Sequence, residues 1–280
     1  MEINKKILEA LKSVRKKNPL VHHITNYVTA NDCANITLAI GGSPVMTDDI
    51  NEVCDMVILA SAFVINIGTL NSITIESMIQ GGKKANTLNI PVVLDPVGVG
   101  ATLYRTNVAK RIIEEVKISV IRGNLSEIKT LYGINTKTKG VDSGDIIDVN
   151  TDEFINAKDI AKDFAKRLNA VVSITGAVDI ITDGYILYSV YNGNRIMSKI
   201  TGTGCMCTSL IGSYLGAVEN KLIATLSGIV SMGIAGEIAY ESIDKDNEGI
   251  GTLKVKIIDY IYKLDEKIIL ERAKVKEEKN

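Results

Sequence analysis

The strongest constraint on the fold of this chain is an alternation between short β-rich apolar runs and longer stretches in which apolar residues recur at helical spacing. The apolar runs cover residues 57–67, 91–95, 119–122 and 171–175. The helical stretches between them cover residues 72–88, 106–116, 126–132 and 152–168. This order is typical of parallel strands joined by helices. It predicts an α/β fold with a mainly parallel central sheet flanked by helices on both faces.

The pattern changes in the last hundred or so residues. Apolar runs at 180–182 and 185–190 flank Asp183-Gly184, a dipeptide that favours a tight turn, so we expect an antiparallel hairpin at one edge of the sheet. From Thr203 onward helical spacing dominates and predicts a helical C-terminal part. Its longest stretches cover residues 207–218, 222–242 and 254–273, and residues 274–280 are expected to fray.

The composition bounds the domain count and the class of partner. The 280 residues lie within the range of one large α/β domain and no Pro-, Gly- or Ser-rich linker divides them, so we predict a single domain over residues 1–280. With 32 basic and 33 acidic side chains the net charge is −1, which argues against nucleic acid or an anionic membrane as the main partner.

The sequence predicts a cytoplasmic location. The chain shows no signal peptide and no apolar run of membrane-spanning length. Its four cysteines lack disulfide-dense spacing, which fits a reducing compartment. The Cys205-Met206-Cys207 spacing is poor for zinc.

The most distinctive motif is Thr201-Gly202-Thr203-Gly204-Cys205. We expect it to connect a strand over residues 195–200 to a helix that continues over 207–218. Its glycines let backbone N–H groups approach a phosphate, and the helix start adds the positive end of its dipole, so the motif predicts an anion site. The same field is expected to lower the pKa of the Cys205 thiol and make it a usable base. A turn formed for packing alone is the alternative.

Other polar residues should gather beside this motif, because ligands of open α/β sheets bind outside the carboxyl ends of the strands. Four polar segments occupy such places, at residues 66–69, 95–100, 122–127 and 175–176. We expect all four on one edge of the sheet, on the same side as the turn of residues 202–205.

Asp95, Glu127 and Arg122 are the charged residues of these segments with candidate roles. Two carboxylates near a phosphate turn suit a Mg²⁺ ion that bridges nucleotide oxygens, and arginine offers a planar fork for phosphate. Each also has a structural alternative. Asp95 can cap a turn, Glu127 can complete a capping box with Asn124, and Arg122 can form an ordinary ion pair.

Nearer the N-terminus, His22 and His23 are adjacent on an extended segment and should point to opposite faces, so we interpret them as structural. Met46 can line an apolar ligand pocket or pack in the core, because thioethers suit both places.

Several motifs follow one another along the chain, at residues 19–26, 42–46, 64–69, 91–101, 121–127, 139–143 and 201–205. In this order they resemble the hydroxyethylthiazole kinase family of thiamine salvage, within the ribokinase-like superfamily. The resemblance implies a ribokinase-like three-layer fold. It also implies Mg²⁺-dependent transfer of the ATP γ-phosphoryl group to the hydroxyl of 4-methyl-5-(2-hydroxyethyl)thiazole.

The resemblance also implies roles for single residues. Cys205 takes the place where most ribokinase-like enzymes have an aspartate base. The thiazole-binding positions are Met46, Gly202, Asn26 and Gly68. The ATP-binding positions are Arg122, Thr175, Thr203 and Gly204, and Asp95 and Glu127 belong to the metal and phosphate region. The family is similar to homotrimers with sites between subunits, and it often has His-Cys where this chain has His22-His23.

Three other interpretations are weaker. Ribokinase-like kinases for hydroxymethylpyrimidine or pyridoxal, and hydrate dehydratases, typically carry aspartate in place of Cys205. A regulatory protein that binds ATP without turnover is opposed by the intact set Asp95, Glu127, Arg122 and Cys205. A dinucleotide dehydrogenase would need a Gly-x-Gly-x-x-Gly motif after the first strand, which is absent.

Overall fold

The computed structural model describes residues 2–134 and 151–278, and the described strands form one nine-stranded sheet. Its order is β2-β1-β3-β4-β5-β6-β7-β8-β9. The parallel part consists of β2 (Ser43–Met46), β1 (Leu20–Ile24), β3 (Ala62–Asn66), β4 (Val92–Asp95), β5 (Val120–Asn124) and β6 (Val171–Thr175). The antiparallel edge consists of β7 (Asp179–Thr182), β8 (Leu187–Val190) and β9 (Val275–Glu277). The predicted mainly parallel sheet with an antiparallel edge is confirmed.

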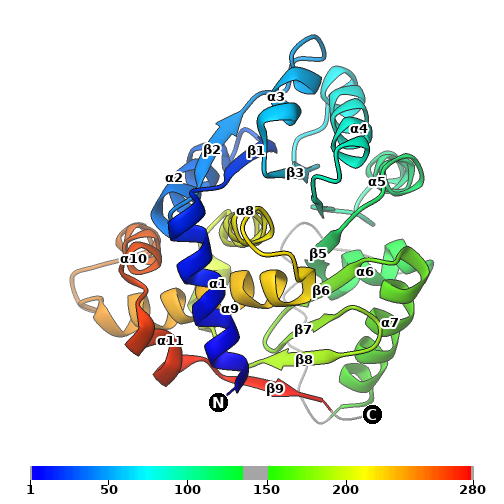
Figure 1. Ribbon diagram of the computed structural model, residues 1–280. Coiled ribbons are helices and arrows are strands. Elements are labelled where there is room, and N and C mark those ends of the chain that lie inside the picture. The colour runs from blue at the N-terminus through cyan, green and yellow to red at the C-terminus, as the bar shows by residue number, and fades with distance from the viewer. Residues whose placement is uncertain (1, 135–150, 279–280) are drawn as a thin grey trace.

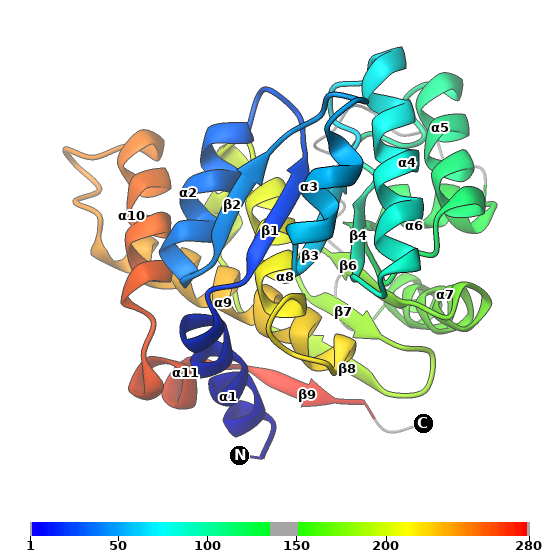
Figure 2. The ribbon, with the colours of Figure 1, turned by 45° about the horizontal axis from the view of Figure 1, so that its top comes forward.

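Helices cover both faces of this sheet, as Figures 1 and 2 show. One layer consists of α3 (Val53–Leu59), α4 (Ser72–Thr87), α5 (Leu103–Glu115), α6 (Leu125–Tyr132) and α7 (Asp152–Leu168). The other consists of α1 (Glu2–Lys17), α2 (Ala30–Ile40), α8 (Thr203–Leu215), α9 (Lys221–Ser242), α10 (Ile250–Lys263) and α11 (Glu266–Arg272). Each layer packs its own apolar cluster against the strands, so the fold has three layers.

Some expected elements differ from those observed. Residues 57–59 belong to helix α3 and not to a strand, because Val53 and Val57 stand four residues apart and are both buried. Residues 195–199 form a 3₁₀ helix, η1 (Arg195–Lys199), and not the expected strand. Gly193 has φ 127° and Asn194 caps Ile196 N–H, so the chain turns there.

The ends of the chain also differ from expectation. The extended segment that carries His22 and His23 forms strand β1, and Met46 ends a further strand, β2, that was not expected. Residues 254–273 form two helices, because the chain turns at Leu264 and Asp265 caps α11. Residues 275–277 do not fray but pair with β8 as strand β9. The motif at 139–143 lies outside the described residues.

Helix α9 corrects the expectation that no apolar run reaches membrane-spanning length. Its 22 residues are long and apolar enough to cross a membrane by length and composition. However, 89% of its most apolar window is buried inside the protein, where it packs against α8, α10 and the sheet. Its apolar character therefore matches its place in the core.

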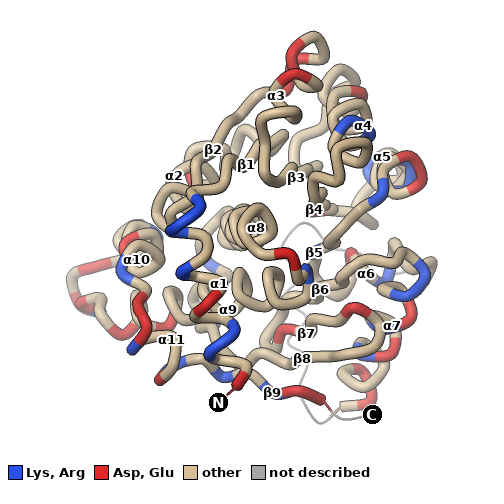
Figure 3. The backbone as a smooth tube through the Cα atoms, in the orientation of Figure 1, with Lys and Arg blue, Asp and Glu red and all other residues tan. Residues whose placement is uncertain are grey.

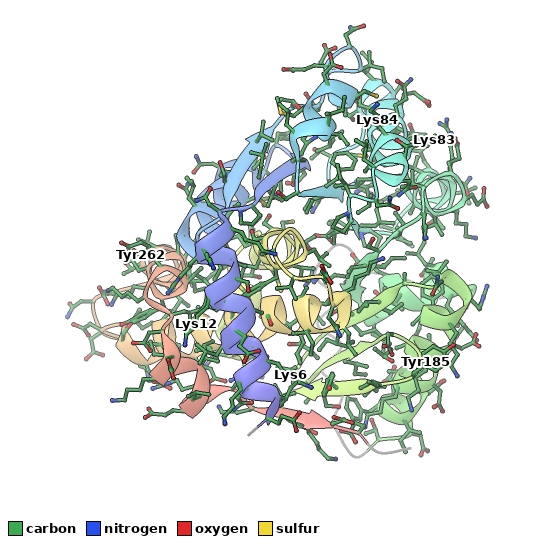
Figure 4. The ribbon with its side chains drawn as sticks, viewed as in Figure 1. Lys6, Lys12, Lys83, Lys84, Tyr185 and Tyr262 are labelled. Atoms are coloured by element: carbon green, nitrogen blue, oxygen red, sulfur yellow. The ribbon has the colours of Figure 1, made fainter. Side chains whose placement is uncertain are left out.

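Charged side chains are concentrated at the periphery. Figure 3 shows none on α8, β1 or β3, the elements at the centre of the fold. The lysines labelled in Figure 4 lie on the outside of α1 and α4, where Lys12 bonds Glu266 of α11 and Lys83 bonds Glu115 of α5. Such exposed pairs contribute little stability, so the apolar clusters carry most of it.

Candidate active site

The four polar segments predicted to share one edge of the sheet do so, because β3, β4, β5 and β6 are parallel neighbours. Asn66 pairs in register with Asp95, and Asn124 pairs with Thr175. Helix α8 begins at the same edge, where Thr208 bonds Asp95. The carboxyl ends of the strands and the start of α8 therefore form one site.

Glycines allow the close packing at the start of α8. Gly202 has φ 93°, and a Cβ atom there would lie 2.6 Å from Thr29 Cγ2. A Cβ atom on Gly204 would lie 2.5 Å from Arg122 Nη1, so the guanidinium lies directly against the helix start. No described side chain caps this helix. Its first N–H groups, from Thr203 to Cys205, lack the carbonyl partners that a longer helix would supply.

Arg122 extends from β5 towards this helix start. Its Nη2 donates to Thr175 Oγ1 at 2.6 Å, while its Nη1 lies 3.8 Å from Asp95 Oδ1, beyond a hydrogen bond. Its buried Nε has no partner among the described residues. The guanidinium therefore keeps donors that a phosphate can use, in addition to its long-range attraction to Asp95.

Asp95 is completely buried at the end of β4. Its Oδ2 accepts hydrogen bonds from Asn66 Nδ2 and Thr208 Oγ1, both at 2.9 Å, while its Oδ1 accepts no hydrogen bond from the described residues and has only the Arg122 guanidinium nearby. Burial raises the pKa of Asp95, and the nearby Arg122 charge and the two donors oppose that rise. The Oδ1 atom gives this carboxylate one position at which a cation can bind.

Glu127 forms the capping box that the sequence permitted. Its Oε2 accepts from Asn124 N–H at 2.8 Å, and Asn124 Oδ1 accepts from Glu127 N–H at 2.9 Å. Its Oε1 accepts from Gly98 N–H at 2.7 Å, which ties the loop after β4 to α6. Burial, assisted by the Asp95 charge, raises the pKa of Glu127 to about 7.

Cys205, in the first turn of α8, is 9% exposed. Its Sγ accepts hydrogen bonds from Asn66 Nδ2 at 3.2 Å and from Asn26 Nδ2 at 3.4 Å. Burial, followed by the Asp95 charge, raises the pKa of the thiol above its ordinary value. The expected lowering of this pKa was wrong, because desolvation and a neighbouring carboxylate outweigh the helix start and the hydrogen bonds of the sulfur with Thr29, Asn66 and Asn26.

The residues expected to contact the thiazole occupy two places. Asn26 and Gly68 lie together, since a Cβ atom on Gly68 would meet Asn26 at 2.9 Å, and Asn26 reaches Cys205. Gly202 packs on Thr29, whose N–H and Oγ1 both bond Asn26 Oδ1. Met46 lies apart from them, at the end of edge strand β2, and is 36% exposed.

A hollow of about 190 Å³ adjoins Met46 and is also lined by His23, Tyr27 and Thr69. A larger hollow, of about 440 Å³, lies near Pro91 and Ser119, which directly precede β4 and β5. It is therefore at the amino ends of the strands, and none of the expected site residues lines it. The smaller hollow is therefore the one that belongs to the candidate site, because it shares the β1 and β3 loop ends with Asn26 and Gly68.

The two histidines fit the structural interpretation. His22 Nε2 contacts Thr47 O at 2.7 Å, and His23 Nδ1 contacts Val21 O at 3.0 Å. Burial lowers the pKa of His22, and it lowers the pKa of His23 to about 4. Within residues 2–134 and 151–278, no group of three His, Cys, Asp or Glu side chains is arranged to hold a metal ion.

Sequence reasoning missed Arg105 as part of the site. From α5, its Nη1 donates to the carbonyls of Ile67, Gly68 and Val97. The guanidinium thus ties the loop after β3 to the loop after β4. No local pattern marks such a residue, because its partners are backbone carbonyls that only the folded sheet brings together.

Asn66 and Thr208 were also missed as site residues, although signals for both were present. Asn66 begins a polar segment directly after a predicted strand, and Thr208 stands three residues after Cys205 on the same helix. Residues three apart on a helix share one face, so Thr208 could have been placed near the thiol.

The chain is similar to known proteins over nearly its whole length. The sequence profile of the hydroxyethylthiazole kinase family matches residues 11–267. The chain is 59% identical over 276 residues to a hydroxyethylthiazole kinase of Clostridium tetani, with 98% of this chain and 99% of that one covered. It is 54% identical over 277 residues to one of Alkaliphilus oremlandii, with 99% and 100% covered.

Two solved structures also resemble this chain. A hydroxyethylthiazole kinase protein from Pyrococcus horikoshii superposes with a TM-score of 0.87 at 41% identity, covering 98% of this chain and 100% of that one. The pyridoxal kinase from Staphylococcus aureus in complex with ADP gives a TM-score of 0.57 at 15% identity, covering 78% and 87%. The second likeness concerns the fold alone.

Proposed function

This chain belongs to the hydroxyethylthiazole kinase family, and from that premise we propose that it phosphorylates the hydroxyl of 4-methyl-5-(2-hydroxyethyl)thiazole with ATP and Mg²⁺ in thiamine salvage. One observation carries the proposal. The Cys205 thiol, the Asp95 carboxylate and the Arg122 guanidinium lie together at the start of α8.

The ATP side of the site consists of the α8 start and its neighbours. Phosphoryl transfer requires mainly positioning and neutralisation of charge. The N–H groups of Thr203 and Gly204 and the guanidinium of Arg122 supply donors and positive charge for the phosphates. Thr175 holds Arg122 in place through its 2.6 Å hydrogen bond.

Asp95 and Glu127 are the residues that would hold Mg²⁺. The fit rests on the buried Oδ1 of Asp95, which accepts no hydrogen bond from the described residues, and on an all-oxygen donor set, which magnesium prefers. When bound, the ion supplies charge neutralisation at the nucleotide phosphates. Glu127 also accepts hydrogen bonds from the N–H groups of Gly98 and Asn124, so it has a second role, which is to orient the loop at Gly98.

Cys205 accepts the proton of the substrate hydroxyl. A loose transition state deprotonates the alcohol late, so a weak base suffices. The two amide donors from Asn26 and Asn66 stabilise the thiolate form of Cys205, which is neutralised when it takes the proton of the alcohol.

The thiazole binds near Asn26, Gly68, Gly202 and Met46 in this proposal, and the protein is a homotrimer with sites between subunits. Tyr27 is 83% exposed and Val28 58% exposed beside this region, which supports a partner chain there.

We also propose that the protein has one domain over residues 1–280, is cytoplasmic, and has no nucleic-acid or membrane partner. The shared nine-stranded sheet, the free thiols and the dispersed charges support these last points.

The test is ADP production from ATP and Mg²⁺ with the thiazole alcohol, a hydroxymethylpyrimidine or pyridoxal as acceptor. We expect release that depends on the thiazole alcohol alone. Release with pyridoxal or the pyrimidine alone would assign the protein to another ribokinase-like activity. ATP binding without release for any acceptor would favour the regulatory interpretation.

A further inference from the structure

We propose, on the basis of the proposed function, that Asn66 is a positioning residue that holds the Cys205 sulfur and the Asp95 carboxylate with one amide group. Asn66 ends β3 and is 2% exposed. Its Nδ2 donates to Asp95 Oδ2 at 2.9 Å and to Cys205 Sγ at 3.2 Å. The proton acceptor and the proposed metal ligand therefore share one donor.

The orientation of this amide is fixed from its other end. Asn66 Oδ1 accepts from Gly68 N–H at 2.9 Å and from Asn26 Nδ2 at 3.0 Å. A flipped amide would place its oxygen against Asp95 Oδ2 and its NH₂ group against two donors. Every polar atom of the side chain thus has a matching partner in only one orientation.

Three elements set the geometry. The register between β3 and β4 puts Asn66 directly opposite Asp95. Helix α8 brings Cys205 to one hydrogen of the amide and Thr208 to the Asp95 Oδ2 that accepts the other. The amide therefore lies between Cys205 Sγ and Asp95 Oδ2 and donates one hydrogen to each. These donations offset the repulsion between the two groups when both are negative.

Asn26 cannot replace this function. It also donates to Cys205 Sγ, at 3.4 Å, but its other bonds go to Thr29 and to Asn66 itself. Removing Asn66 withdraws a donor from both Cys205 and Asp95, whereas removing Asn26 leaves the Asp95 bond in place.

The test uses two variants of the full chain, Asn66→Asp and Asn66→Ala. Asn66→Asp is nearly isosteric and keeps an acceptor for Gly68 and Asn26, but its carboxyl group has at most one hydrogen and cannot donate to Cys205 and Asp95 at once. Asn192→Ala is the matched control. Asn192 is also buried, and its amide bonds the Glu237 carboxylate at 3.2 Å and backbone groups of Arg272 and Lys274 on the other side of the fold.

Two readouts are compared. The first is kcat and KM with the thiazole alcohol. The second is the pH midpoint for alkylation of Cys205 by iodoacetamide without substrates, followed on the Cys205 peptide by mass spectrometry. We expect both Asn66 variants to lose kcat by about 10- to 100-fold, since a hydrogen bond to a charged group has that effect, with KM changed less. We expect the midpoint to rise, so that about tenfold less thiolate is present at a given pH.

The outcomes separate the two proposals. A wild-type protein that does not phosphorylate the thiazole alcohol overturns the proposed function, and the alkylation midpoint still tests Asn66. Asn66 variants with wild-type kcat and midpoint, or with losses no larger than those of Asn192→Ala, overturn the positioning role. If Asn66→Ala does not fold, the isosteric Asn66→Asp decides.

Discussion

The acidity of Cys205 is decided by neighbours that act in opposite directions. Asn26 and Asn66 stabilise the thiolate by donation, while burial and Asp95 oppose it more strongly. The thiol is therefore the major form at neutral pH, and the minor thiolate form is the one that accepts the hydroxyl proton late in the reaction, becoming the thiol.

The first prediction concerns this residue. Cys205→Ala should fold and bind ATP but lose roughly 10²–10⁴ in kcat, the usual worth of a general base. Cys205→Asp should keep activity, because a carboxylate can take the same proton. Steady-state kinetics and ATP titration of both variants check this. A Cys205→Ala enzyme running at the parent rate would show that another group accepts the proton.

A second prediction concerns His23, whose pKa burial lowers to about 4. Between its ordinary pKa near 6.5 and that value, the unfolded chain binds a proton that the folded chain does not, so the free energy of unfolding falls as the pH falls. Above about pH 6.5 His23 is neutral in both states and does not reduce stability. At about pH 5 the free energy of unfolding should be lower by roughly 2 kcal/mol.

Urea unfolding at neutral and mildly acidic pH measures this decrease, with His23→Gln for comparison. The variant keeps a polar side chain that does not titrate, and His22 remains in both proteins. Equal acid sensitivity of the two proteins would show that His23 is not the responsible group.

The start of helix α8 is the element on which the site is built. It begins at a left-handed glycine without a side-chain cap, packs on Thr29, and brings Cys205 and Thr208 to the strand ends on one face. An uncapped helix start leaves N–H groups for a ligand, whereas α4, α6 and α7 satisfy theirs with Asn71, Asn124 and Thr151.

The third prediction tests this element. Gly202→Ala places a Cβ atom 2.6 Å from Thr29 Cγ2 at φ 93°, so it should destabilise the protein by about 1–3 kcal/mol and weaken ATP binding. Gly249→Ala is the control, because nothing lies within 4 Å of its Cβ position and its φ is −117°. Urea unfolding and ATP titration compare the two. Equal stability of both variants would contradict the packing argument.

The molecule as a whole leaves apolar side chains exposed beside the site. Tyr27 and Val28 are in the loop between β1 and α2, and Met46 ends edge strand β2, which pairs with β1 on one side and with no described strand on the other. Exposed apolar groups at an open sheet edge favour association with another chain.

The fourth prediction follows from this surface. Light scattering should give the molar mass of a trimer. Tyr27→Glu should dissociate the trimer and reduce kcat, because the variant would bury a charge at the subunit interface. Tyr185→Glu, at a residue 76% exposed on the β7–β8 turn, should leave the trimer intact. A fully active wild-type monomer would exclude sites shared between subunits.

The strands that carry the site were predictable because β-rich apolar runs with helical connections specify parallel pairing locally. The Asn124–Glu127 capping box was predictable for the same reason, since both partners lie within four residues. The strands β1, β2 and β9 were not, because short strands of mixed polarity depend on neighbours from distant parts of the chain.

By itself the sequence determined the α/β order, the glycine turn before Cys205 and the family to which these motifs belong, since each is encoded by local spacing. Only the tertiary structure decided the direction of the Cys205 pKa, the hold of Asn66 on Cys205 and Asp95, and the tie from Arg105 to two loops. Burial and contacts brought about by the folded sheet set these properties, as between Asn66 and Cys205, which are 139 positions apart, and no local pattern records them.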